Sequence, residues 1–187
     1  MGLSRDDFSE VYLFFDYDGH QTNLENTVHE DVICQMLESF DNETENGKLY
    51  ISYPMVEALR DYEPGKCGDG KDCFADIQGL STYKNISANR AYNPHFKEND
   101  FELWKQVIDV FALRVSCLYK TSVVMEYEQY SNEVTPCEIY VRETKEAEKQ
   151  GVFVLSAFPE FLVDYFGVKL WKTSVKHTKN ERDKCEI

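Results

Sequence analysis

The feature that most constrains the fold is the apolar run at residues 11–15, which leads directly into Asp16, Tyr17 and Asp18. A run of this length, bounded by a glycine turn, is typical of a buried strand. The two aspartates then lie where the strand leaves the sheet, which is the edge at which ligands bind in open α/β folds. Two neighbouring carboxylates repel each other, so they favour a bound divalent cation or a proton. The sequence therefore predicts a carboxylate–metal site at the end of this strand.

A helix and a second strand follow the first strand. Apolar residues recur at helical spacing over residues 28–40, and Thr27 with Glu30 has the pattern of a capping box at the start of this helix. A second apolar run at residues 49–53 stops at Pro54, where a further helix begins. Two strands joined by one helix form a βαβ unit with parallel pairing. The carboxyl ends of both strands are therefore expected at the same edge of the sheet.

Parallel pairing brings Ser52 and Glu57 toward Asp16 and Asp18, although they are distant in sequence. Hard cations such as Mg²⁺ and Mn²⁺ prefer oxygen ligands, so we predict Asp16, Asp18 and Glu57 as metal ligands and catalytic groups. Ser52 is predicted to hydrogen-bond a phosphate, and His20 to bind the metal or to move a proton. The structural alternative is that the aspartates cap a turn and that Glu57 favours the first turn of a helix.

The rest of the chain predicts three further regions beside a βαβ core at residues 1–62. Residues 63–98 begin with a stretch rich in glycine and proline and are expected to form an irregular loop region. Residues 99–171 predict a helical extension with one further strand at 152–156, and residues 172–187 a polar tail. The helices expected in the extension span residues 100–119, 138–150 and 159–166, the last of them ending at Gly167.

The net charge of −14 limits the partners of this chain. An acidic chain repels nucleic acid on average, so such a contact requires a metal or local basic residues. The basic residues Lys84, Arg90, Lys97 and Lys105 are scattered, and any of them can line a substrate groove. No apolar stretch reaches the length of a membrane span and no signal-peptide pattern is present, so we expect a cytoplasmic protein without membrane contact. The six cysteines contain no C-x-x-C pair, which favours free thiols over a zinc site.

The order of a strand, D-x-D, a helix and then residues 52–59 (S-Y-P-M-V-E-A-L) resembles the Toprim fold of topoisomerases, primases and OLD-type nucleases. The resemblance covers about residues 11–62 and is closest to the bacterial defence branch with OLD-like and RloB-like proteins. It implies a Toprim-like parallel sheet flanked by helices, followed here by the helical extension. It also implies nuclease-like phosphoryl transfer on nucleic acid with Mg²⁺ or Mn²⁺, in which Asp16 and Asp18 bind the metal.

One part of the Toprim pattern has no counterpart in this sequence. A Toprim domain carries a glutamate after an earlier strand, which acts as general acid or base, whereas Glu10 lies too close to the D-x-D strand and on its wrong side. The resemblance therefore implies that this sequence is the C-terminal part of a longer protein, with an N-terminal region before it. A homo-oligomer is also among the partners that the sequence leaves open. It also leaves open a degenerate domain that serves as a non-catalytic interaction module.

Residues 15–20 also resemble the first motif of haloacid dehalogenase-like phosphatases, an apolar strand followed by D-x-D-G-T. This second resemblance implies that Asp16 is the nucleophile, that Asp18 is the acid and base, and that Ser52 supplies the second motif. His20 stands in the place of the motif's threonine, and the later acidic motif fits the spacing poorly. A phosphatase is therefore the alternative prediction.

Overall fold

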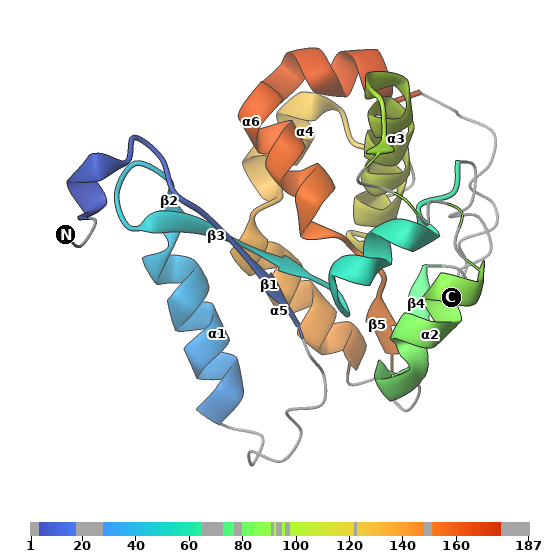
Figure 1. Cartoon of the computed structure of the whole chain (residues 1–187), viewed down its shortest axis with the longest axis horizontal. Helices are drawn as coiled ribbons and strands as arrows, with labels where there is room; N and C mark the ends of the chain where they lie inside the picture. Colours follow the sequence, from blue (N-terminus) through green and yellow to red (C-terminus); the bar gives the residue numbers. More distant parts are fainter. Residues whose placement is uncertain are drawn as a thin grey trace.

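The computed structural model describes residues 4–17, 28–64, 73–76, 80–90, 92, 95, 98–121, 123–147 and 151–176 (Figure 1). The strands are β1 (Tyr12–Asp16), β2 (Asp41–Asn42), β3 (Gly47–Ser52), β4 (Phe74–Asp76) and β5 (Gly151–Phe153). The α-helices are α1 (Val28–Ser39), α2 (Leu80–Arg90), α3 (Phe101–Leu118), α4 (Tyr127–Glu133), α5 (Pro136–Ala147) and α6 (Ala157–Ser174). Two 3-10 helices are η1 (Arg5–Asp7) and η2 (Val56–Asp61). The predicted α/β class is confirmed.

β1 and β3 form the parallel pair that the sequence predicts, with α1 between them in the chain. Their register places Asp16 opposite Ser52, so both strands end at the same edge. β2 pairs antiparallel with β3 on its other side, and β4 pairs antiparallel with β5. Among the strands that the structure describes, parallel pairing is therefore confined to β1 and β3.

The two small sheets meet at the end of β3. Tyr53 and Leu155 exchange backbone hydrogen bonds of 2.7 and 2.8 Å, and the amide of Val154 donates to the carbonyl of Cys73 at 2.8 Å. The segment that contains β5 thus pairs with the chain after β3 on one side and with β4 on the other. A strand near the C-terminus in sequence thereby extends the sheet built by the first fifty residues.

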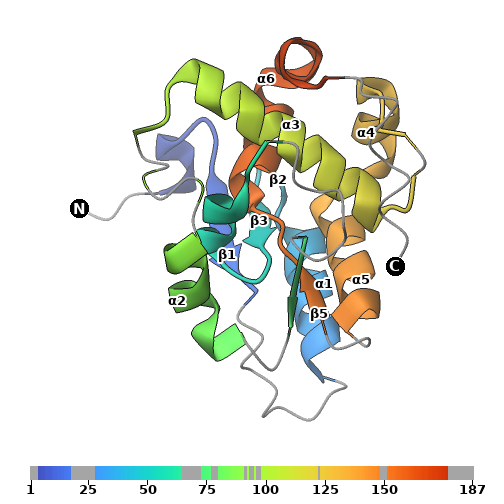
Figure 2. The same cartoon turned by 90° about the vertical axis from the view of Figure 1, so that its right-hand side faces the viewer.

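Opposite faces of the β1–β3 pair pack against different helices, because successive side chains of a strand point to opposite faces. On one face Phe14 contacts Phe161 of α6 at a ring-centroid distance of 5.4 Å, and Tyr50 contacts the same ring at 6.0 Å. Leu49 and Ile51, on the other face of β3, are buried on the side of α1 and α5. Figures 1 and 2 show α1 and α5 together on one side of the sheet and α6 on the other.

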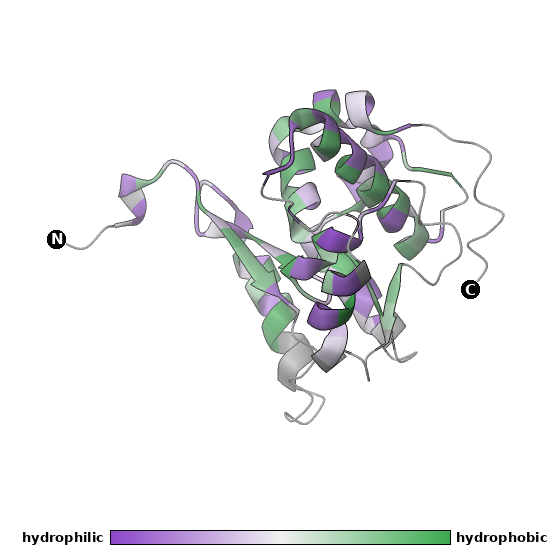
Figure 3. Cartoon of the chain, turned by 45° about the vertical axis from the view of Figure 1, so that its right-hand side comes forward, coloured by the Kyte–Doolittle hydropathy of each residue, from purple (hydrophilic) through white to green (hydrophobic). Residues whose placement is uncertain are grey.

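The prediction of a buried first strand is wrong, because β1 lies at the edge of the three-stranded sheet. Phe14 is 43% exposed and Phe15 is 50% exposed, whereas Leu49 in the central strand β3 is 1% exposed. Figure 3 shows strands of this sheet largely in the hydrophobic colour. A short apolar run reveals that a strand is half-buried or fully buried, but it does not reveal the place of that strand within a sheet.

The predicted helices of the extension are present with shifted ends, and a further helix, α4, lies between α3 and α5. α6 is kinked at Gly167, which has φ 63° and ψ −153°, so the predicted helix does end there. A second helical segment then continues to Ser174, because Leu170 and Trp171 are buried. Val175 is buried as well, so the predicted polar tail begins later than residue 172.

Two regular elements lie in the region predicted to be an irregular loop. β4 is three residues long and pairs with β5, and α2 buries only Tyr83 and Ser87 among its described side chains. A strand this short and a helix with so little apolar periodicity give almost no sequence signal. The predicted N-cap of α1, Thr27, lies outside the described residues.

Candidate acidic edge and a second ligand cluster

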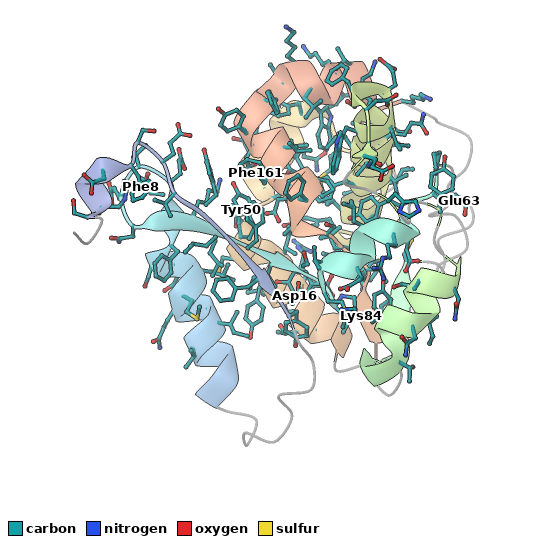
Figure 4. The ribbon with its side chains drawn as sticks, in the orientation of Figure 1. Phe8, Asp16, Tyr50, Glu63, Lys84 and Phe161 are labelled. Carbon is teal, nitrogen blue, oxygen red and sulfur yellow. The ribbon has the colours of Figure 1, made fainter. Side chains whose placement is uncertain are left out.

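Asp16 ends β1 at the edge where β3 also ends. Its carboxylate Oδ1 accepts a hydrogen bond of 2.7 Å from the backbone amide of Val56, the first residue of η2. The chain reaches this position through a cis peptide bond between Tyr53 and Pro54. Asp16 therefore holds the start of η2 against the end of β1, and Figure 4 shows it at that end of the strand.

Glu57 follows Val56 in η2 and is 8% exposed. One carboxylate oxygen forms an ion pair of 3.0 Å with Nζ of Lys84 on α2. Because the amide of Val56 is bonded to Asp16, the structure brings Asp16 and Glu57 to the same edge of the sheet. From the sequence, Lys84 is one of several scattered basic residues. The packing of α2 against η2 brings it next to Glu57.

Ser52 is the last residue of β3 and is 4% exposed. Its hydroxyl oxygen accepts a hydrogen bond of 3.2 Å from the backbone amide of Ala157, at the start of α6. The side chain predicted to bind phosphate is therefore engaged in positioning α6, although a hydroxyl that accepts one bond can also donate another. Asp18 and His20 lie outside the described residues, so their predicted roles stay predictions.

The observed contacts do not use all the acceptor capacity of the Asp16 and Glu57 carboxylates. An ionised carboxylate offers about four acceptor positions, so one hydrogen bond or one ion pair leaves capacity for a metal ligand bond. Asp16 and Glu57 supply the oxygen donors that Mg²⁺ and Mn²⁺ prefer. Among the described residues, neither Asp16 nor Glu57 belongs to a cluster of three potential ligand atoms. Asp18 is the residue that the D-x-D pattern would add.

A different group of potential ligands lies between α1 and α5. Cys34 and Glu38 are one helical turn apart on α1, and Cys137 lies in the first turn of α5. The two sulfur atoms are 3.6 Å apart, and the three ligand atoms all lie within 4.8 Å of one another. Within the part of the chain that the structure describes, this is the only cluster of at least three such ligands. Sequence reasoning missed it because the two cysteines are 103 residues apart.

Burial raises the pKa of two groups, Cys137 in this cluster and Glu160 on α6. Desolvation, with smaller contributions from the neighbouring Cys34, raises the pKa of the Cys137 thiol to about 11. Desolvation and the nearby Asp164 raise the pKa of Glu160 on α6 well above its ordinary value, and Lys48 opposes that shift.

No helix among the described residues is both long and apolar enough to cross a membrane. Comparison of the chain with protein-family models, with curated proteins and with solved structures gives no match.

Proposed function

We propose that the acidic edge formed by Asp16, Asp18 and Glu57 binds Mg²⁺ or Mn²⁺ and catalyses phosphoryl transfer on nucleic acid. The proposal includes a Toprim-like relationship and a nuclease-like reaction in anti-phage defence, both of which rest on the sequence resemblance. The observation that carries it is the hydrogen bond from the Val56 amide to the Asp16 carboxylate, which joins the helix of Glu57 to the end of the D-x-D strand.

The chain's own residues have distinct roles in this proposal. Asp16 and Asp18 hold the cation, and Glu57 completes or orients its oxygen ligands. When bound, the cation stabilises negative charge on the phosphodiester and orients the attacking water. The amine of Lys84, whose side chain is 68% exposed, lies beside Glu57 and can contact a phosphate oxygen. His20 is the candidate for proton transfer, because its ordinary pKa lies near neutrality.

A non-catalytic interaction module is the second candidate, and a specific observation favours it. Asp16, Ser52 and Glu57 each have a structural partner, namely a backbone amide, another backbone amide and a lysine. A degenerate domain would keep these contacts to hold its fold. The two candidates therefore differ in metal binding and turnover rather than in structure.

The decisive experiment compares the wild-type chain with Asp16→Asn. Asparagine keeps an oxygen that can accept from the Val56 amide but removes the negative charge, so the fold should persist while metal binding is lost. Isothermal titration with Mn²⁺ and Mg²⁺ measures binding, and cleavage of plasmid DNA and of single-stranded RNA in Mn²⁺ measures activity. Asp41→Asn is the matched control, because Asp41 is exposed at the opposite end of the sheet.

We expect wild type and Asp41→Asn to bind Mn²⁺ and cleave nucleic acid, and Asp16→Asn to do neither. Turnover that survives in Asp16→Asn would show that the site is placed wrongly. Wild-type protein that is folded yet takes up neither cation supports the interaction module instead. Hydrolysis of a generic phosphate monoester without cleavage of nucleic acid would point to the phosphatase alternative.

A further inference from the structure

The cluster of Cys34, Glu38 and Cys137 has the donor atoms of a site for a soft divalent cation. Thiolates select cations such as Zn²⁺ over Mg²⁺, and one carboxylate oxygen is a usual companion ligand. Residues four apart on a helix lie on the same face, so Cys34 and Glu38 both point toward α5 from α1. The cluster therefore differs in chemistry and in position from the acidic edge at Asp16.

The separation of the two sulfur atoms is that of a thiol–thiol hydrogen bond and is also close to the separation that a shared cation requires, whereas it is too long for a covalent bond. Two Zn–S bonds of about 2.3 Å that open at the tetrahedral angle place their sulfurs about 3.8 Å apart. The observed Sγ–Sγ distance between Cys34 and Cys137 is 3.6 Å. A disulfide requires about 2.05 Å, which the two helices would have to reach by moving closer together.

The charges around the thiols also favour a cation. The carboxylates of Glu38 and Glu138 add to the negative surroundings of Cys137, and Cys34 donates or accepts a hydrogen bond with it. Negative surroundings oppose the formation of an isolated thiolate, but they attract a positive ion. Binding of a cation displaces the thiol protons, so the cost of deprotonation is met by the metal–sulfur bonds.

We propose that Cys34, Glu38 and Cys137 form a three-ligand site for Zn²⁺ or a similarly thiophilic divalent cation, which clamps α1 to α5. A fourth position is open to water or to an exogenous ligand, as in other zinc sites with three protein ligands. α1 connects β1 to β3, and α5 packs against β3 and β5. The bound ion therefore joins the helix of the parallel pair to the helix that supports the second sheet.

Cobalt substitution tests the site directly, because Co²⁺ bound by thiolate gives a charge-transfer absorption that oxygen ligands alone do not give. The full chain is used with Cys67→Ser and Cys185→Ser, which removes two thiols outside the described residues. We expect one equivalent of Co²⁺ to produce this absorption and Zn²⁺ to abolish it by competition. Cys34→Ser and Cys137→Ser should each remove it, whereas Cys117→Ser, which removes a half-buried thiol outside the cluster, should keep it.

Glu38→Gln separates the carboxylate from the thiols. The charge-transfer absorption should persist, and the affinity for Co²⁺ should fall by more than the roughly tenfold loss typical of removing an outer-shell partner. Circular dichroism confirms that each variant is folded. Asp16→Asn should leave the cobalt absorption unchanged, so failure of the acidic edge and failure of this cluster are distinguishable.

Two results would overturn the proposal. One is a reduced, folded protein that shows no thiolate–cobalt absorption, or an absorption that survives in both Cys34→Ser and Cys137→Ser. The other is a Cys34–Cys137 disulfide, formed with hydrogen peroxide and identified by mass spectrometry, in a protein whose reduced form takes up no Co²⁺. That second result would assign the pair to thiol oxidation rather than to metal binding.

Discussion

Arg114 is a fully buried cation that connects three parts of the chain. Its guanidinium donates to the carbonyl of Val154 and, at 2.7 Å, to the carbonyl of Asp61, and it lies 4.5 Å from the ring centroid of Tyr62. Asp61 ends η2, so Arg114 fixes from α3 the short helix that carries Glu57. Arg114 therefore helps to position Glu57 at the acidic edge, although its own hydrogen bonds go to Val154 and Asp61.

Replacing Arg114 with methionine should therefore destabilise the protein strongly. Methionine fills similar space but leaves two buried carbonyl oxygens without their charged donor, and each such hydrogen bond is worth about 1.5–3 kcal/mol. We expect the free energy of unfolding in urea to fall by about 3 kcal/mol or more. Lys169→Met, at an exposed position on α6, is the control and should change it little. A small effect of Arg114→Met would contradict a supporting role for this cation.

Glu160 gives the protein a definite dependence on pH. Its folded-state pKa is raised, by burial first and by Asp164 second, whereas the ordinary value is 4.5. Above the ordinary value the unfolded chain loses a proton that the folded state keeps, so stability falls as the pH rises toward the folded pKa. The slope for one such group approaches about 1.4 kcal/mol per pH unit.

Glu160→Gln should remove this dependence, because glutamine resembles the protonated acid but does not titrate. We expect the variant to be more stable than wild type near pH 8, with the difference shrinking toward about pH 5. Urea unfolding across this range measures it, and Glu128→Gln, at an exposed position on α4, should show no such trend. If the stability advantage of the variant over wild type instead grows toward acid pH, the pKa of Glu160 is not raised in the folded protein.

At the scale of elements, the kink in α6 depends on one glycine. Gly167 has φ 63° and ψ −153°, a region that is essentially restricted to glycine. Gly167→Ala should cost about 1–3 kcal/mol of unfolding free energy, because the Cβ strains this backbone while the second segment of α6 remains anchored by Trp171. Val168→Ala is the neighbouring control at a partly exposed position. An unchanged urea midpoint for Gly167→Ala would mean that α6 straightens at no cost.

The elements that the sequence predicts are those whose side chains repeat regularly. α1 and α3 carry clear apolar periodicity, β3 contains a short apolar run, and the single helix between β1 and β3 fixes their parallel pairing. α2 was missed because its burial comes from packing on η2 rather than from an apolar stripe. The exposure of β1 was missed because the position of a strand in a sheet depends on partners distant in sequence.

For the candidate site, the sequence predicts which residues reach the same sheet edge but not the contacts that their side chains make. The parallel register brings Ser52 to Asp16, as one helix between two strands requires, and η2 brings Glu57 to the same edge. The contacts of Glu57 and Ser52 come from α2 and α6, respectively. These helices are distant in sequence, so no local sequence pattern predicts the contacts. The cluster of Cys34 and Cys137 joins two helices far apart in the chain, so spacing rules for metal motifs do not detect it.

At the scale of the whole molecule, a strongly acidic chain presents a contiguous aromatic surface. Phe14 contacts Phe158, and Phe161 contacts Tyr165, which in turn contacts Phe166. Phe14, Phe158, Tyr165 and Phe166 are each at least 39% exposed. Exposed apolar patches and edge strands favour association, whereas a net charge of −14 opposes it.

We therefore expect self-association that increases with salt, because the Debye length falls to about 3 Å near 1 M and screens the repulsion. Sedimentation velocity of wild type should show larger species at high salt, and Phe166→Lys should reduce them. Ile86→Lys is the matched control, because this exposed apolar residue lies on α2, which packs against η2 and β4. A wild-type chain that stays monomeric at every salt concentration would rule out this surface as an association site.

The pairing of Tyr53 with Leu155 has a consequence for how this protein can be divided. A fragment that stops before α3 would lack the strand that closes the sheet beside η2, and the amide of Ala157 that meets Ser52. Domain dissection at that boundary would thus yield two pieces that each expose unsatisfied backbone. If the two halves are expressed as separate polypeptides, we expect folded, soluble protein only when both are expressed together.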